Sequence, residues 1–223
     1  MLLILLLTPL NLTDVEAAQS ASPPLLGRRI VIDAGHGGID PGACRGNLTE
    51  ETIVLDLALQ LRDLLAAAGA DVRLTRETDK DLSDSVPLER SNSRKRRDII
   101  GRVEFVNKLR PDVFLSLHVN AISASRWRGA QVFFQQQNPQ SAALAEALQA
   151  ALGRVLQNTD RQPKPGDYRI LKDSEAPSAL LEIGFISNPE EAKLLADPSY
   201  RRQVAWAILD GLLHWWGSPP PTE

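Results

Sequence analysis

The chain has 223 residues, enough for one large domain or two small ones, and its 43% hydrophobic and 24% charged residues are ordinary for a globular fold. The formal net charge of −3 provides no basic excess for phosphates, so the composition does not indicate a nucleic-acid partner. The single cysteine, Cys44, excludes an intramolecular disulfide, and a core of normal size must hold the fold together.

The N-terminus differs in composition from the rest. Residues 1–10 (MLLILLLTPL) are almost wholly apolar but too few to span a bilayer, which takes about 20. A small-residue stretch around Ala17 and Ala18 is similar to a signal-peptidase site, although the positively charged start of a signal peptide is missing. An apolar helix packed on the domain is the alternative. We expect a signal-like or anchor segment with a linker, then one folded domain, then a tail, over residues 1–26, 27–217 and 218–223.

Strand-like and helix-like segments alternate along the chain, which predicts an α/β fold. The expected strands are 28–33, 71–75, 112–120, 130–135, 168–171 and 178–185. The expected helices are 50–68, 99–109, 141–157, a helix capped by Asn188 with Pro189 in its first turn, and 198–216. We expect the polar stretch 79–97, with its basic run 94–97, to be a solvated surface excursion.

Three reactive side chains lie at or near the ends of predicted strands. His36 follows the first strand within a glycine-rich stretch, His118 lies where the strand from 112 breaks, and Glu182 lies towards the end of the strand from 178. Functional residues collect at the carboxyl ends of parallel strands, so these three are expected to converge at one sheet edge.

Each of these residues also has a purely structural interpretation. His36 could be a turn residue and His118 a core histidine, whereas Glu182 interrupts an apolar strand and needs a partner for a costly buried carboxylate. Glu50 stands three residues after Asn47, which is capping-box spacing. His214, beside two tryptophans, is interpreted as a packing or surface residue.

Two imidazoles and a carboxylate are typical of a catalytic zinc site whose fourth position is open to water. Glu50 and Glu182 are the carboxylate candidates, and they should divide two roles, one as metal ligand and one as general base for the water.

The chain resembles the zinc-dependent N-acetylmuramoyl-L-alanine amidases. The resemblance rests on Ile32–Ala43 (IDAGHGGIDPGA), the helix-opening Glu50, Phe114–Ala121 (FLSLHVNA) and Pro177–Glu191 (PSALLEIGFISNPEE), four blocks in the family's order. It covers roughly residues 28–216 and implies an open, mixed sheet of about six strands with helices on both faces.

The family pattern implies specific roles. One Zn²⁺ ion would be bound by His36, Glu50 and His118, and Glu182 would be the catalytic carboxylate. Relatives usually have Glu-Lys at the helix start, where this chain has Glu50-Glu51, so Glu51 is a rival ligand. We expect Asp33 and Asn120 to orient the ligands.

Within the family, the stretch Arg126–Phe134 and the excursion 79–97 look most like the germination-specific amidases of sporulation. This implies cleavage between the lactyl group of N-acetylmuramic acid and L-alanine in peptidoglycan, as a step towards muramic-δ-lactam in the spore cortex. We therefore expect an exported protein at the outer face of a membrane, in a periplasm-like or forespore intermembrane space. The N-terminal segment could associate it with the membrane. Whether an activating protein partner is needed is left open.

Arg126, Trp127 and Arg128 are candidate substrate contacts, since sugars stack on tryptophan and arginines pair with carboxylates, or else they form an exposed, solvated loop. Rival functions are another zinc carboxypeptidase or deacetylase acting on the cell wall, and a non-catalytic wall-binding module.

Overall fold

The computed structural model describes residues 22–217, so the predicted signal-like segment up to residue 21 and the tail 218–223 lie outside the described residues. The end of the predicted linker is part of the domain. Leu25 is fully buried in the main core, and its backbone N–H donates to the Ala68 carbonyl oxygen.

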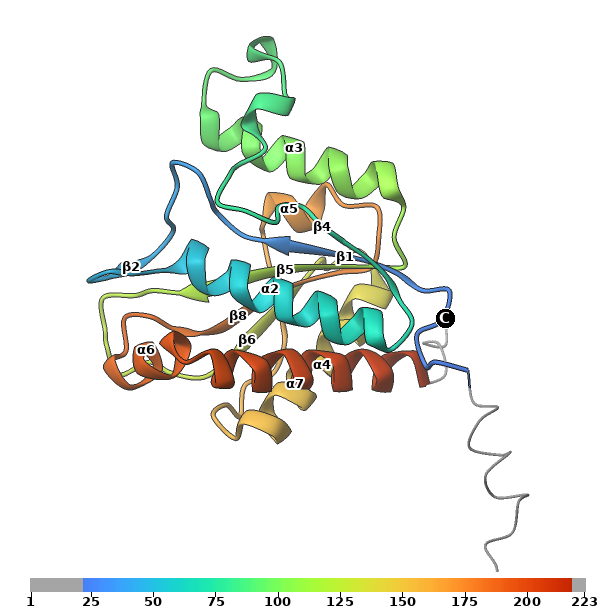
Figure 1. Cartoon of the computed structure of the whole chain (residues 1–223), viewed down its shortest axis with the longest axis vertical. Coiled ribbons are helices and arrows are strands. Elements are labelled where there is room, and N and C mark those ends of the chain that lie inside the picture. Colours follow the sequence, from blue (N-terminus) through green and yellow to red (C-terminus); the bar gives the residue numbers. More distant parts are fainter. Residues whose placement is uncertain (1–21, 218–223) are drawn as a thin grey trace, which may run out of the picture.

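A six-stranded mixed sheet forms the centre of the molecule, as expected from the resemblance (Figure 1). Its order is β4-β1-β5-β8-β6-β7. The strands are β1 Arg29–Ala34, β4 Asp71–Leu74, β5 Val113–Asn120, β6 Gln131–Phe134, β7 Lys164–Pro165 and β8 Ser178–Phe185. The first four in the order are parallel, and β6 runs antiparallel to β8. A short hairpin joins β2 Cys44–Arg45 to β3 Leu48–Thr49.

Helices cover both faces of the sheet (Figure 1). One face carries α2 Glu50–Ala67, α4 Pro139–Leu156 and α7 Pro198–Gly217, with α6 Pro189–Ala196 beside α7. The other face carries α3 Arg94–Leu109 and the short α5 Arg169–Lys172. Between β4 and α3 lie the 3₁₀ turns η1 Ser83–Ser85 and η2 Leu88–Arg90.

The central strands are apolar on both sides because both of their faces are covered. In β1, Ile30 and Ile32 belong to the larger core under α2 and α7, while Val31 belongs to the smaller core under α3 and α5. This explains why these strands read as continuous hydrophobic runs.

The structure corrects two predicted elements. The stretch 168–171 is not a strand: residues Arg169–Lys172 form α5, and the edge strand comes earlier as Lys164–Pro165. The helix expected from residue 99 begins at Arg94, because the Ser93 hydroxyl caps it by accepting from the Arg96 N–H. The whole basic run 94–97 therefore belongs to a helix, and Arg97 is buried.

Within residues 22–217, no helix is long and apolar enough to cross a bilayer.

Candidate active site

His36 lies just beyond β1, in a loop that turns sharply across the end of the sheet. Its backbone has φ = +60°, a left-handed conformation that few non-glycine residues adopt. The His36 Nδ1 atom lies 3.0 Å from Asp40 Oδ2, and the Nε2 atom lies 3.2 Å from Glu50 Oε1. Burial alone lowers the pKa of His36, but the hydrogen bonds and charges of Glu50 and Asp40 outweigh it and raise that pKa. The histidine is held by one carboxylate on each ring nitrogen.

Glu50 opens α2, and the predicted alternative of a helix capped by Asn47 is wrong. The N-cap is Thr49, and the buried Glu50 carboxylate does not reach back to the helix start. Its Oε1 atom accepts from the Val119 N–H at 2.8 Å, and its Oε2 atom accepts from the Ala43 N–H at 2.9 Å. The first residue of α2 therefore places its carboxylate at the end of the sheet.

His118 lies near the end of β5, the strand next to β1, and its Nδ1 atom lies 3.0 Å from Glu50 Oε1. The two histidine rings meet edge to face with centroids 5.0 Å apart. Glycine makes room for this approach: a Cβ at Gly35 would lie 2.4 Å from His118 Cε1, and one at Gly42 would lie 2.6 Å from Glu50 Oε2. The glycine-rich stretch around His36 therefore allows the close approach of these side chains.

One donor atom from each of His36, Glu50 and His118 lies within 4.8 Å of the other two. Two imidazole nitrogens and one carboxylate oxygen are the donor set of catalytic zinc sites. The set fits zinc also because Asp40 holds the far nitrogen of His36, as carboxylates do for metal-bound imidazoles. The neighbouring Glu51 does not join this cluster, since its Oε1 atom accepts from the hydroxyls of Thr49 and Thr52.

Glu182 lies on β8 directly beside His118 in the parallel register of β5 and β8. Its Oε2 atom is buried and has no hydrogen-bond partner. Burial raises the pKa of Glu182 to about 7. A carboxyl group with that pKa at neutral pH can both accept and donate a proton.

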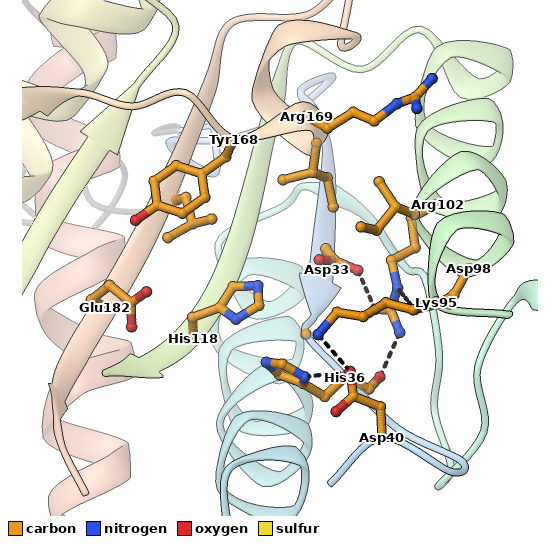
Figure 2. A pocket seen from close by; sticks show the side chains of 14 residues that line it. Asp33, His36, Asp40, Lys95, Asp98, Arg102, His118, Tyr168, Arg169 and Glu182 are labelled. Carbon is orange, nitrogen blue, oxygen red and sulfur yellow. Dashed lines mark hydrogen bonds and ion pairs between the residues drawn. The ribbon is translucent and has the colours of Figure 1, made fainter. Parts of the chain in front are cut away.

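A cavity of about 150 Å³ is lined by His36, His118 and Glu182. Figure 2 shows Tyr168 and Glu182 on one side of it and Asp33, Lys95, Asp98 and Arg102 on the other, with His36 and His118 between. Ile170 and Leu180 contribute apolar wall. The predicted convergence of His36, His118 and Glu182 at one sheet edge is thus what the structure has.

Other sequence-predicted residues are placed differently. The fully buried Asp33 accepts hydrogen bonds from Thr75, Ser116 and Arg102, and not from the histidines. Burial alone would raise the pKa of Asp33, but Arg102 and the other neighbours lower it, so the carboxylate is ionised. The Asn120 backbone carbonyl oxygen accepts from the Ile186 N–H, and the orienting role of the Asn120 side chain stays a prediction.

Arg126, Trp127 and Arg128 line a groove next to the 157–161 segment, and none of them lines the cavity of His36 and Glu182. Their role as substrate contacts stays a prediction. The cavity is instead lined by charged and aromatic side chains that sequence reasoning did not select, among them Lys95, Arg102, Tyr168 and Arg169. The basic run 94–97 contains Lys95, but from the sequence this run indicated only a solvated surface.

Two imidazoles and a carboxylate near the Glu182 carboxyl group, at the carboxyl edge of an α/β sheet, are typical of metal-dependent hydrolases, and the fold and site together indicate a hydrolase with a candidate metal site. The chain belongs to the N-acetylmuramoyl-L-alanine amidase family, because the profile of that family matches residues 30–214.

Individual relatives agree with this assignment. The chain is 37% identical to the germination-specific N-acetylmuramoyl-L-alanine amidase of Bacillus subtilis, covering 98% of this chain and 94% of that one. It is 32% identical to the probable cell wall amidase LytH of Staphylococcus epidermidis, covering 92% of this chain and 64% of LytH. Among solved structures it is similar to the CwlD amidase from Clostridioides difficile, which was solved in complex with the GerS lipoprotein. That match has a TM-score of 0.79 and 36% identity, and covers 86% of this chain and 99% of the other.

Proposed function

We propose that this amidase binds one zinc ion through His36, Glu50 and His118 and hydrolyses the amide bond between the lactyl group of N-acetylmuramic acid and L-alanine in peptidoglycan. The observation that carries the proposal is the juxtaposition of this donor set with the unpartnered Glu182 carboxyl group, since His36 and His118 line the same cavity as Glu182. Zinc in such a site supplies a Lewis acid that polarises the carbonyl and activates water.

Side chains of the protein carry out the proton transfers and orient the metal ligand. The Glu182 carboxylate takes a proton from the attacking water as the water oxygen bonds to the lactyl carbonyl carbon. Its pKa of about 7 leaves it able to pass that proton to the alanine nitrogen as the carbon–nitrogen bond breaks. The products are a free lactyl carboxylate and a free amine on L-alanine. Asp40 holds the His36 ring through Nδ1, which leaves Nε2 directed at the cluster.

A digest of purified peptidoglycan, with and without a chelator, tests this proposal. Mass analysis should find peptide stems with a new L-alanine amine and glycan with an intact lactyl group, and the chelator should abolish their release. Glu182→Gln should fold normally and lose activity by about 10²- to 10⁴-fold, the usual contribution of a general base. Release of acetate, or of C-terminal amino acids alone, would instead identify a deacetylase or carboxypeptidase.

We further propose that the substrate is spore-cortex peptidoglycan, in the step that precedes muramic-δ-lactam formation. The 37% identity to a germination-specific amidase over nearly the full length of both chains supports this role. Expression in a Bacillus subtilis strain that lacks its own germination-specific amidase should restore muramic-δ-lactam to the cortex. The Glu182→Gln variant is the control, and failure of the active protein to restore the lactam would restrict the role to other wall peptidoglycan.

We propose that the protein works outside the cytoplasm, where peptidoglycan lies, and that it has a protein partner. The CwlD amidase was solved in complex with the GerS lipoprotein, which supports a partner of lipoprotein type. Co-elution of this chain with such a lipoprotein from the same genome, in size-exclusion chromatography, tests the pairing.

A further inference from the structure

We infer that Arg102, on the helix α3, is a positioning residue that fixes the backbone of His36 and thereby sets the metal affinity of the His36–Glu50–His118 cluster. The inference rests on the proposed zinc site. It adds a residue that touches none of the three donor atoms and acts on one of them through the main chain.

Arg102 is 2% exposed and lies beneath the His36 loop, where Figure 2 shows it reaching from α3 towards the loop. Its Nη2 atom donates to the His36 carbonyl oxygen at 2.5 Å, and its Nη1 atom donates to the Ala34 carbonyl oxygen at 2.8 Å. The guanidinium thus bridges the last residue of β1 and the metal-binding residue two positions later. A planar fork of donors suits such a bridge, and a lysine ammonium could not copy it.

The sheet fixes Arg102 in turn. Its Nη1 atom pairs with Asp33 Oδ1 at 2.6 Å, and Asp33 is completely buried. Asp33 is itself held by the hydroxyls of Thr75 and Ser116, each at 2.7 Å. Thr75 follows β4 and Ser116 lies on β5, the strands on either side of β1, so the anchor of the guanidinium belongs to the rigid centre of the fold.

His36 needs this support because of its backbone. A φ of +60° is unfavourable for a residue with a Cβ, and such conformations persist when the surroundings over-determine them. Asp40 fixes the ring at Nδ1, and Arg102 fixes the carbonyl. Because the ring and the carbonyl of His36 are both held, its Nε2 atom faces Glu50 Oε1 in the metal-free protein. Without Arg102 the loop can relax towards ordinary backbone angles, and binding a metal must then include the cost of restoring the left-handed turn.

A second buried arginine provides a matched control. Arg201 is 8% exposed on α7, pairs with the more exposed Asp56 and donates to the Leu195 carbonyl oxygen, so it is likewise a buried arginine bonded to a carboxylate and a backbone carbonyl. It does not line the cavity of His36 and Glu182. Truncation of either arginine leaves a buried carboxylate or carbonyl without its partner, and both should lower the stability of the protein.

The experiment compares Arg102→Met, Arg102→Lys and Arg201→Met with wild type. Competition with a chromogenic chelator gives the zinc dissociation constant of each protein, and thermal unfolding gives the melting temperature of its metal-free form. Arg102→Met should weaken zinc binding by about 10- to 100-fold, the usual effect of removing a group that orients a metal ligand. Arg102→Lys, the milder change, should give an intermediate constant. Arg201→Met should lower the melting temperature without changing the zinc constant.

Wild-type zinc affinity in a folded Arg102→Met or Arg102→Lys variant would overturn the inference. An equal loss of affinity in Arg201→Met would do the same, since the effect would then follow from general destabilisation. Failure of the wild-type protein to bind zinc at all would instead refute the proposed metal site. No outcome depends on measuring peptidoglycan cleavage.

Discussion

At the scale of single residues, Glu50 joins three parts of the chain. Its two oxygens contact His36, His118 and the N–H groups of Ala43 and Val119. Burial alone would raise its pKa, but the two histidines outweigh that and hold it far below the usual range. The carboxylate is therefore charged at neutral pH, between two imidazoles that can share a cation.

The neighbouring glutamates allow a matched test of that role. Glu50→Gln should lose zinc, because a neutral amide is a poor ligand and the buried site loses its negative charge. Glu51→Gln should keep full zinc occupancy, since Glu51 contacts only the hydroxyls of Thr49 and Thr52 through its carboxylate. Elemental analysis of the purified variants measures occupancy, and the reverse result would make Glu51 the ligand.

The buried Glu182 carboxyl should make the stability of the metal-free protein depend on pH. Its pKa is about 7 in the folded state and 4.5 ordinarily, so between these values the folded protein holds a proton that the unfolded chain has released. The free energy of unfolding therefore falls as pH rises through this window, by at most about 1.4 kcal/mol per pH unit from this group. The contribution of protonated Glu182 to the free energy of unfolding is complete below pH 4.5 and is lost as pH rises past 7.

Glu182→Gln removes this titration. Urea unfolding of metal-free protein from pH 5 to pH 8 should show the variant gaining stability relative to wild type as pH rises, by about 1–3 kcal/mol in total. Parallel curves for the two proteins would mean that Glu182 titrates normally.

At the scale of elements, the site is assembled where the β1–α2 loop meets the end of β5. The loop follows the sheet closely because Gly35 has no side chain, and the His118 ring occupies the space that a Cβ would take. The absence of a side chain at Gly35, in the loop after β1, thus permits the rotamer of His118 on β5.

Gly35→Ala should displace His118 and weaken zinc binding by at least tenfold, because the added carbon would lie 2.4–2.8 Å from three atoms of the ring. Gly46→Ala is the control in the same loop: Gly46 has a positive φ of 58°, but a Cβ there would meet no atom within 4 Å. That variant should lose about 1 kcal/mol of stability from backbone strain and keep its zinc affinity. Equal zinc constants in both variants would show that the His118 ring can move without cost.

Sequence periodicity identified the long elements and failed for the short ones. The eighteen-residue α2 and the eight-residue β8 have clear apolar patterns, because each is packed against a large core. The four-residue α5 is too short to show a helical repeat, and its sequence RILK suits a strand equally well. Its hydrogen bonds to Tyr168 and the burial of Ile170 and Leu171 under α3 decide its conformation.

At the scale of the whole molecule, the cluster joins the loop after β1, the start of α2 and the end of β5 into one unit. A ligand that binds only the folded state stabilises it by mass action, by about 2.7 kcal/mol when its concentration is 100 times the dissociation constant. The proposed zinc ion should therefore contribute to global stability as well as to catalysis.

Chelation should lower the melting temperature by about 5–10 °C, given a shift of about 2–4 °C per kcal/mol for a chain of this size. Glu182→Gln should show the same drop, because Glu182 is not a member of the donor cluster. His36→Ala should show none, since it has lost a ligand. Calorimetry with and without chelator provides the measurement, and an unchanged wild-type melting temperature would contradict a metal bound in the folded state.

The sequence by itself determined the α/β class, most strand and helix positions, and His36, His118 and Glu182 as reactive residues at strand ends, because burial imprints a local pattern on the chain. Resemblance to a family assigned the ligand role to Glu50 and the catalytic role to Glu182. Only the tertiary structure separated Glu50 from Glu51, since adjacent helical residues point about 100° apart and the packing of α2 decides which one faces the histidines. It alone also joined Arg102 to the carbonyl of His36, sixty-six residues earlier in the chain. Contacts of that kind leave no periodic signal, because they depend on how helices pack on a sheet and not on the pattern within either segment.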